Sequence, residues 1–107
     1  MISFEDFKKV EIKIGTIVSA EKIDGADKLL KLMINLGNPE PTQILAGIAQ
    51  FYDPATLVGK QLPVVVNLEP SVLKGYSSNG MILAADGNGQ PIILHPEKEV
   101  PPGSIVK

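Results

Sequence analysis

Lysine is the only strong base in this chain, which has ten lysines and no arginine. A lysine ammonium meets a phosphate as a point charge, whereas the planar guanidinium of arginine suits bidentate recognition of phosphate and guanine. Four lysines lie on or beside the segments where we expect a binding face, namely Lys13, Lys28, Lys31 and Lys74. They form a candidate electrostatic footprint for nucleic acid. The alternative is four solvated surface lysines, because lysine is mostly exposed in folded proteins.

Polar and aromatic side chains that suit nucleotide contacts gather in residues 67–81. Asn67 suits a base or ribose edge, and it suits equally well a cap on the turn that follows it. Ser78 and its neighbours offer hydroxyl and amide groups to a phosphate or a 2′-hydroxyl, or they satisfy a tight loop. Tyr76 and Met81 are candidates for stacking on an exposed base. The chain has few aromatic residues and needs several for its core, so Met81 in the core is the simpler interpretation.

The residues do not indicate a catalytic or metal site. His95 is the only histidine and there is no cysteine, so the usual zinc ligand sets cannot be built. A serine triad lacks a placed Ser-His-Asp set. Asp24 with Asp27, and Glu97 with Glu99, are paired by spacing alone and are typical of turns and surfaces. We expect no catalytic residue, no metal and no cofactor.

The composition bounds the class of protein. At 107 residues, with 44% hydrophobic and 21% charged residues, the chain reads as one soluble globular domain. The net charge of −2 argues against indiscriminate phosphate binding, so any nucleic-acid site is a local patch. There is no apolar run long enough for a transmembrane helix, and the absence of cysteine favours the cytoplasm. We therefore expect a cytoplasmic protein that does not interact with membranes.

Period-two alternation dominates the first half. Residues 10–14 alternate, and Gly15 stands where the phase slips, which indicates a bulge or sharp bend. A turn at 24–27 precedes a second alternating run, 29–36, whose leucine and isoleucine positions point inward. A turn at 37–39 and a third strand over 42–48 follow. Before them, Ser3 predicts the N-cap of a helix over residues 4–9, whose two phenylalanines close one end of the core.

The second half predicts a short helix and further strands. Asp53 as N-cap, Pro54 at the first helical position and Gly59 as the stop delimit about a turn and a half of helix. A buried strand over 62–68 and another over 80–85 enclose a polar loop, 69–79. The run Asp-Gly-Asn-Gly at 86–89 is a hairpin turn, and a last apolar strand follows the prolines at 101–102.

Three strands, a short helix and two more strands, with a bend in the first, is the order of an OB-fold. We therefore predict an all-β domain, a five-stranded Greek-key barrel with an N-terminal helix and a C-terminal β extension. The barrel would span about residues 10–86 and the extension about 87–107 of a single domain, 1–107. The segments 24–28 and 69–79 are then the loops that flank the oligonucleotide face of such a barrel.

Six short segments in this register resemble the tRNA-binding domain family. They are Phe4-Glu5-Asp6-Phe7 with Val10 to Val18, Ala26-Asp27-Lys28-Leu29, Ala46-Gly47-Ile48, Leu57-Val58-Gly59-Lys60, Val65-Val66-Asn67-Leu68 with Pro70, and Ser78-Asn79-Gly80-Met81. The family includes the C-terminal domain of many methionyl-tRNA synthetases and stand-alone dimeric tRNA-binding proteins. The resemblance covers essentially the whole chain, and the ending looks most like the branch appended to synthetases.

The resemblance implies a non-catalytic OB-fold that binds tRNA by shape and backbone, with little sequence preference. It also implies a homodimer, formed by material outside the barrel, and a methionyl-tRNA synthetase catalytic chain as a partner. The implied tRNA-binding positions are Lys13, Lys28, Lys31, Asn67, Lys74, Ser78 and Met81. The chain departs from the family where basic residues are common: Gln50 and the pair Ser71-Val72 are uncharged, and Glu69 is acidic.

Two hypotheses follow. The first is a tRNA-binding module that assists methionyl-tRNA synthetase. The second, motivated by the acidic balance, the missing arginines and Glu69, is a dimerisation or protein-interaction module on an OB scaffold with weak or no RNA binding. The two are compatible, since the family combines them.

Overall fold

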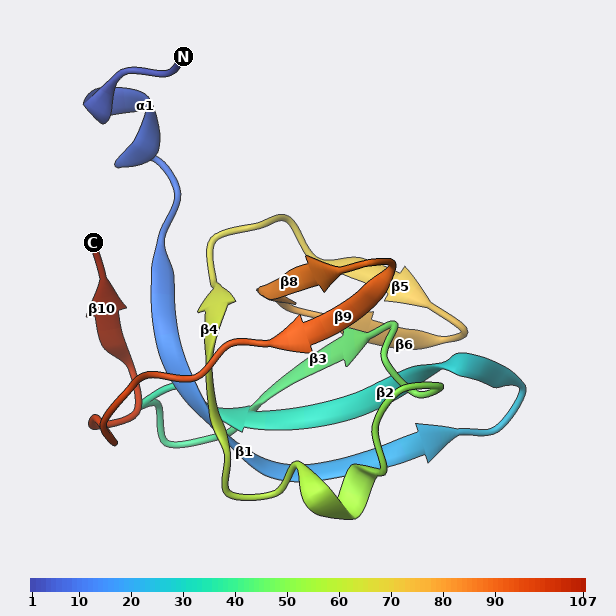
Figure 1. Ribbon diagram of the computed structural model, residues 1–107. Coiled ribbons are helices and arrows are strands. Elements are labelled where there is room, and N and C mark those ends of the chain that lie inside the picture. The colour runs from blue at the N-terminus through green and yellow to red at the C-terminus, as the bar shows by residue number, and fades with distance from the viewer.

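The computed structural model describes all residues from 1 to 107 and is built mostly of antiparallel strands (Figure 1). Its elements are α1 (Phe4–Phe7), β1 (Ile12–Ile23), β2 (Ala26–Asn35), β3 (Thr42–Ala46), the 3-10 helix η1 (Pro54–Thr56), β4 (Gln61–Val65), β5 (Ser71–Leu73), β6 (Tyr76–Ser78), β7 (Met81–Ile82), β8 (Ala84–Gly87), β9 (Gln90–Ile93) and β10 (Ser104–Val106). The main sheet has the order β3-β2-β1-β4-β7, with β10 paired to β1. The predicted all-β class is confirmed, and so is its order of strands around a short helix.

β1 is the strand that holds the two halves of the sheet together. Its first residues pair with β4 on one edge and β10 on the other, and its later residues pair with β2. The strand curves strongly between these partners (Figure 1). The register with β2 shifts between Ile17 and Ser19, so the bulge predicted at Gly15 lies at Val18 instead. Gly15 has a different role, because a Cβ there would collide with the Ile34 side chain.

The alternation in β2 is confirmed. Leu30, Leu32 and Ile34 are fully buried and belong to the main core cluster, together with residues of β1, β3 and β4. The intervening residues point to the outer face, because successive side chains of a strand alternate between faces. Lys31 is therefore held on the outside of the sheet by the burial of Leu30 and Leu32 on either side.

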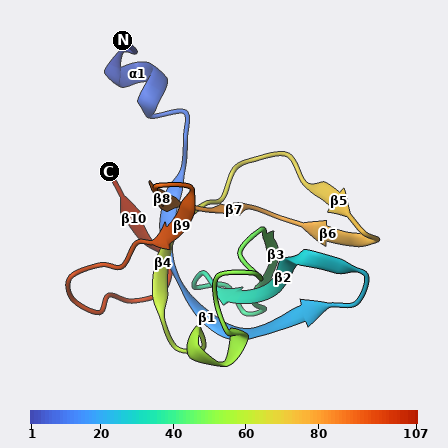
Figure 2. The ribbon, with the colours of Figure 1, turned by 45° about the vertical axis from the view of Figure 1, so that its right-hand side comes forward.

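The predicted loop over 69–79 is a β-hairpin, formed by β5 and β6. Ser71, Val72 and Leu73 pair with Ser78, Ser77 and Tyr76. Lys74 and Gly75 have φ of 52° and 82°, the positive values that a two-residue hairpin turn requires at both positions. The sequence predicted only a polar loop here and missed both strands, because three-residue runs carry little periodicity. This hairpin and the β1–β2 hairpin project in the same direction, side by side in both views (Figures 1 and 2).

No strand ladder joins β3 to β7, and individual hydrogen bonds join β3 to the residues just before β7 instead. The Asn79 N–H donates to the Gln43 carbonyl at 3.0 Å, and the Leu45 N–H donates to the Ser78 hydroxyl at 3.0 Å. Beyond this seam the predicted strand over 80–85 is divided between β7 and β8. The predicted turn at 86–89 is confirmed as the turn of the β8–β9 hairpin.

The expected role of the first helix in the core is wrong. Ser3 caps α1 as predicted, accepting a hydrogen bond from the Asp6 N–H. The helix ends at Phe7 and stands clear of the main sheet's core, beside β10 and both chain termini (Figures 1 and 2). Phe4 is 71% exposed and Phe7 is also exposed, so neither closes the core. An aromatic pair at helical spacing marks an apolar face, and it does not reveal what covers that face.

No helix is long and apolar enough to cross a membrane. No cluster of three or more histidine, cysteine or acidic side chains is arranged to hold a metal ion.

Candidate nucleic-acid interface

Lys31 stands on the outer face of the sheet, between β1 and the β5–β6 hairpin. Its Nζ lies 2.7 Å from Oε1 of Glu21, the residue directly opposite on β1. The same Nζ lies 5.3 Å from the centre of the Tyr76 ring, which is within the range of a cation–π contact. The Lys31 side chain is 24% exposed to solvent. Three elements thus meet at one ammonium group.

The surroundings of Lys31 keep it protonated. The pKa of its ammonium is raised above the ordinary 10.5, first by the hydrogen bond to Glu21 and then by the charge of Glu21. Partial desolvation acts in the opposite direction, and Tyr76 adds a smaller raising contribution. Lys31 therefore carries a full positive charge at neutral pH.

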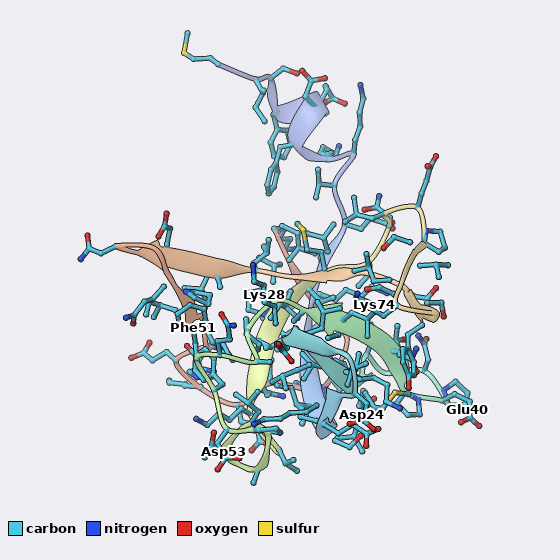
Figure 3. All side chains as sticks on the ribbon, turned by 90° about the vertical axis from the view of Figure 1, so that its right-hand side faces the viewer. Asp24, Lys28, Glu40, Phe51, Asp53 and Lys74 are labelled. Carbon is cyan, nitrogen blue, oxygen red and sulfur yellow. The ribbon has the colours of Figure 1, made fainter.

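Lys28 and Lys74 lie at the tips of the two neighbouring hairpins. Lys28 is exposed near the start of β2, and Lys74 is exposed in the β5–β6 turn. Figure 3 looks onto this end of the molecule and labels both lysines. Neither forms an ion pair. Together with Lys31 they define a group of three lysines, which we call the hairpin patch.

Acidic residues also border the hairpin patch. Asp24 and Asp27, with Lys22 and Gln50, line a polar hollow of about 520 Å³ beside the β1–β2 turn. The patch is therefore mixed in charge, with exposed lysines and carboxylates interspersed. Such a surface attracts phosphates locally, without a large positive field.

Lys13 lies apart from the hairpin patch. It pairs with Val64 of β4 and Ile105 of β10, near the start of β1, whereas Glu21 lies near the end of the same strand. Figure 1 shows β1 curving from the α1 side of the molecule to the hairpin tips. Lys13 instead borders an apolar hollow of about 280 Å³ between α1 and β10.

Asn67 forms hydrogen bonds with the segment that leads into β1. Its side-chain oxygen accepts from the Glu11 N–H at 2.9 Å, and its amide nitrogen donates to the Lys9 carbonyl at 2.7 Å. The pairing of β1 with β4 brings these residues together, although they are more than fifty positions apart. Asn67 therefore holds the connection between α1 and the sheet, a contact that neither sequence interpretation included.

Ser78 and Met81 have different surroundings. Ser78 is only 5% exposed, and its hydroxyl accepts from the Leu45 N–H and donates to the Gly80 carbonyl at 3.3 Å. Met81 is 47% exposed, so its interpretation as a core residue is wrong, and it lines a mainly apolar hollow of about 430 Å³ between β3 and β7. Of the seven implied positions, the structure gathers three into the hairpin patch and places Lys13, Asn67, Ser78 and Met81 outside it.

Sequence reasoning missed Glu21 and gave Tyr76 only a stacking role. The signal for Glu21 was available in principle, because opposite charges facing each other across two strands stabilise a sheet. The register that brings Glu21 opposite Lys31 depends on the bulge at Val18, which the sequence placed three residues too early.

The fold and this patch together define a β module whose two neighbouring hairpins carry exposed lysines. The chain belongs to the family described as "Putative tRNA binding domain", whose model matches residues 12–105. The methionine–tRNA ligase of Methanothrix thermoacetophila is 50% identical over 107 residues, covering 100% of this chain and 16% of that protein. The methionine–tRNA ligase of Lactococcus lactis is 45% identical over 107 residues, covering 98% of this chain and 16% of that protein.

Solved structures show the same likeness. A MetRS related protein from Pyrococcus horikoshii superimposes with a TM-score of 0.93 at 36% identity, covering 100% of this chain and 98% of that chain. The chaperone CsaA from Bacillus anthracis gives 0.89 at 31% identity, covering 100% of this chain and 99% of that chain. This chain spans 16% of the length of the two curated ligases. It matches their non-catalytic tRNA-binding domain, and their catalytic part lies outside the matched segment.

Proposed function

We propose that this chain is a non-catalytic module that binds folded tRNA through the hairpin patch, by shape and backbone contacts with little sequence preference. The observation that carries the proposal is that Lys28 and Lys74 lie on two neighbouring hairpins at one end of a tRNA-binding-family fold, with Lys31 beside Tyr76 of the second hairpin. Each ammonium supplies a point charge for a phosphate. The patch has no arginine and therefore lacks the fork that reads guanine.

The proposed partner is a methionyl-tRNA synthetase catalytic chain in the cytoplasm. The similarity to methionine–tRNA ligases over nearly the whole chain supports this partner. A weak RNA-binding module gains effective concentration when it is tethered to an enzyme that holds the same tRNA. A patch of three lysines among carboxylates is therefore sufficient as an accessory contact.

We also propose that the chain forms a homodimer through α1, β10 and the C-terminal extension at 87–107. Phe4 is 71% exposed and Ile105 is 70% exposed, and both border the apolar hollow between α1 and β10. Large apolar side chains gathered at one surface mark an interaction site. Two copies joined there would present two hairpin patches to one tRNA, and both would contribute to its binding.

This apolar surface also supports the alternative function, a dimerisation or protein-interaction module with weak or no RNA binding. The two functions use different surfaces. Substitutions in the hairpin patch remove RNA binding and leave assembly intact, whereas substitutions at α1 or β10 act on assembly first.

The decisive test measures the binding of total tRNA at 50 and 200 mM salt to the wild-type chain and to Lys28→Gln/Lys74→Gln. We expect affinity that falls steeply with salt, and a shallower salt slope in the double variant because two phosphate contacts are lost. Lys60→Glu is the matched control, since it changes the net charge by the same two units at an exposed lysine after η1, outside both the hairpin patch and the proposed dimer surface. Equal losses in the double variant and in Lys60→Glu would show that net charge acts rather than the patch. No binding at 50 mM salt by a folded dimer would favour the alternative function.

A further inference from the structure

Glu21 already forms an ion pair with the ammonium group of Lys31, which the proposed function uses to bind a tRNA phosphate. The ion pair joins Lys31 Nζ to Glu21 Oε1 at 2.7 Å, and the pair is unequal in exposure. The Lys31 side chain is 24% exposed and the Glu21 side chain is 62% exposed. A phosphate approaching from solvent therefore meets the carboxylate before it meets the ammonium.

The third member of the group limits the freedom of the lysine. The Tyr76 ring centre lies 5.3 Å from Lys31 Nζ, on the β5–β6 hairpin that covers this part of the sheet. A lysine head group on a flexible stem would normally move to follow a ligand. Here the carboxylate and the aromatic ring hold it on the sheet, so binding a phosphate requires an exchange of partners.

We propose that Glu21 is a built-in competitor of the tRNA phosphate for Lys31, which lowers both the affinity and the salt dependence of tRNA binding. The inference rests on the proposed function of the hairpin patch. Two effects combine. The phosphate has to displace Glu21 from the ammonium before it can bind there. A Lys31 already neutralised by Glu21 also releases less condensed counterion from the RNA when it binds.

A competitor of this kind has a use in an accessory module. Three unopposed lysines on adjacent hairpins would hold any polyanion that fits, including tRNA that has to be released. With Glu21 in place, only Lys28 and Lys74 act without an exchange. Lys31 contributes fully only when a phosphate is positioned well enough to replace the carboxylate. The device therefore favours ligands whose shape fits the whole patch.

The purely structural interpretation is that Glu21 and Lys31 only join β1 to β2. Exposed cross-strand ion pairs of this kind contribute little to stability. Removing the charge of Glu21 would then change RNA affinity only as much as any equal change in net charge does. The two interpretations differ in the sign and size of the affinity change, and in whether that change depends on Lys31.

The test compares tRNA binding of the wild-type chain with Glu21→Gln, Lys31→Gln and the double variant. Glutamine keeps the size of the side chain and its acceptor oxygen, and it removes the charge. Glu40→Gln is the matched control. It changes the net charge equally in the loop after β2, at the other end of that strand from the hairpin tips, and Glu40 forms no ion pair.

For Glu21→Gln we expect binding about fivefold tighter at 50 mM salt, because the cost of breaking an exposed pair disappears. We also expect a salt slope steeper by up to about 0.7–0.9, the value of one additional phosphate contact. In the Lys31→Gln background the same change should give no more gain than Glu40→Gln. This non-additivity separates competition at Lys31 from a general charge effect.

Two outcomes would overturn the proposal. Equal gains from Glu21→Gln and Glu40→Gln, in a chain that does bind tRNA, would leave the function standing and remove the competitor. A gain that persists in the Lys31→Gln background would show that Glu21 acts on the phosphate without Lys31. Absence of binding by every variant at 50 mM salt would instead be the failure of the proposed function, and the competitor would fall with it.

Discussion

The hydroxyl of Ser78 accepts a hydrogen bond from the backbone N–H of Leu45 at 3.0 Å, across the seam where β3 meets the end of β6. The same hydroxyl donates to the Gly80 carbonyl. Ser78 thus takes the place of a strand partner for Leu45 at an edge where no ladder forms. The position implied as a tRNA contact is, in the structure, a buried link between two parts of the sheet.

Ser78→Ala should destabilise the fold by about 1–3 kcal/mol, because it leaves the Leu45 N–H without its partner in a buried site. Ser77→Ala is the matched control, since Ser77 is exposed and should change stability by less than about 0.5 kcal/mol. Urea unfolding of the three proteins measures both. If the folded variant binds tRNA more weakly while its stability is unchanged, Ser78 contacts RNA and the structural role is wrong.

The backbone of Lys74 has a strained conformation, which would cost less free energy with asparagine at this position. Its φ of 52° lies in the left-handed region, where asparagine and glycine are at ease and most side chains are not. Lys74→Asn should therefore raise the free energy of unfolding by up to about 1 kcal/mol, while it weakens tRNA binding by removing a phosphate contact. Stability and affinity would change in opposite directions.

Lys74→Ala separates the two effects of that substitution. Alanine removes the charge and keeps the strain, so the alanine and asparagine variants should lose the same affinity, and only the asparagine variant should gain stability. Thermal unfolding and tRNA titration of the same samples provide the comparison. Unchanged affinity in both variants would place Lys74 outside the interface.

The Glu21–Lys31 pair should stabilise the fold up to alkaline pH. The folded-state pKa of Lys31 is raised above 10.5, so its contribution is fully present below 10.5 and is lost as pH rises through the higher folded value. We expect the free energy of unfolding of the parent chain relative to Lys31→Met to be constant from pH 7 to about 10 and to fall above it. Placing both proteins in a Tyr76→Phe background keeps the aromatic ring beside Lys31 and removes the phenol hydroxyl. A difference that is flat up to pH 11.5 would contradict the raised pKa.

Ile105→Glu should dissociate the proposed homodimer. The Ile105 side chain is 70% exposed in the single chain, so the substitution leaves the core intact, and in the dimer it would bury an unpaired charge. We expect the dimer dissociation constant to rise by about 10- to 100-fold, as for an interface hot spot. Val58→Glu, at an exposed valine next to η1, is the control that should leave assembly unchanged. Sedimentation equilibrium measures both. A wild-type chain that is monomeric at micromolar concentration would rule out this interface.

The contrast between β2 and α1 shows how far local patterns extend. In β2 the alternation of Leu30, Leu32 and Ile34 with other residues was sufficient to predict which side chains are buried. A strand with one buried face has only one acceptable register. In α1 the spacing of Phe4 and Phe7 was read correctly as a helix and wrongly as a core contact. A helical stripe shows that a face is apolar, and only the path of the chain after it decides whether that face meets the protein's own core.

Residues close together in the chain were enough to predict the all-β class, the first three strands with the short helix after them, the helix caps and the family. The tertiary structure decided which of the candidate residues meet. The bulge at Val18 sets Glu21 opposite Lys31, the β5–β6 hairpin brings Tyr76 against Lys31, and the pairing of β1 with β4 places Asn67 against Glu11. Such contacts depend on strand register and on hairpin direction, which vary with a single inserted residue. The lysines of the interface could therefore be named from the sequence, whereas the carboxylate that opposes one of them could only be seen in the fold.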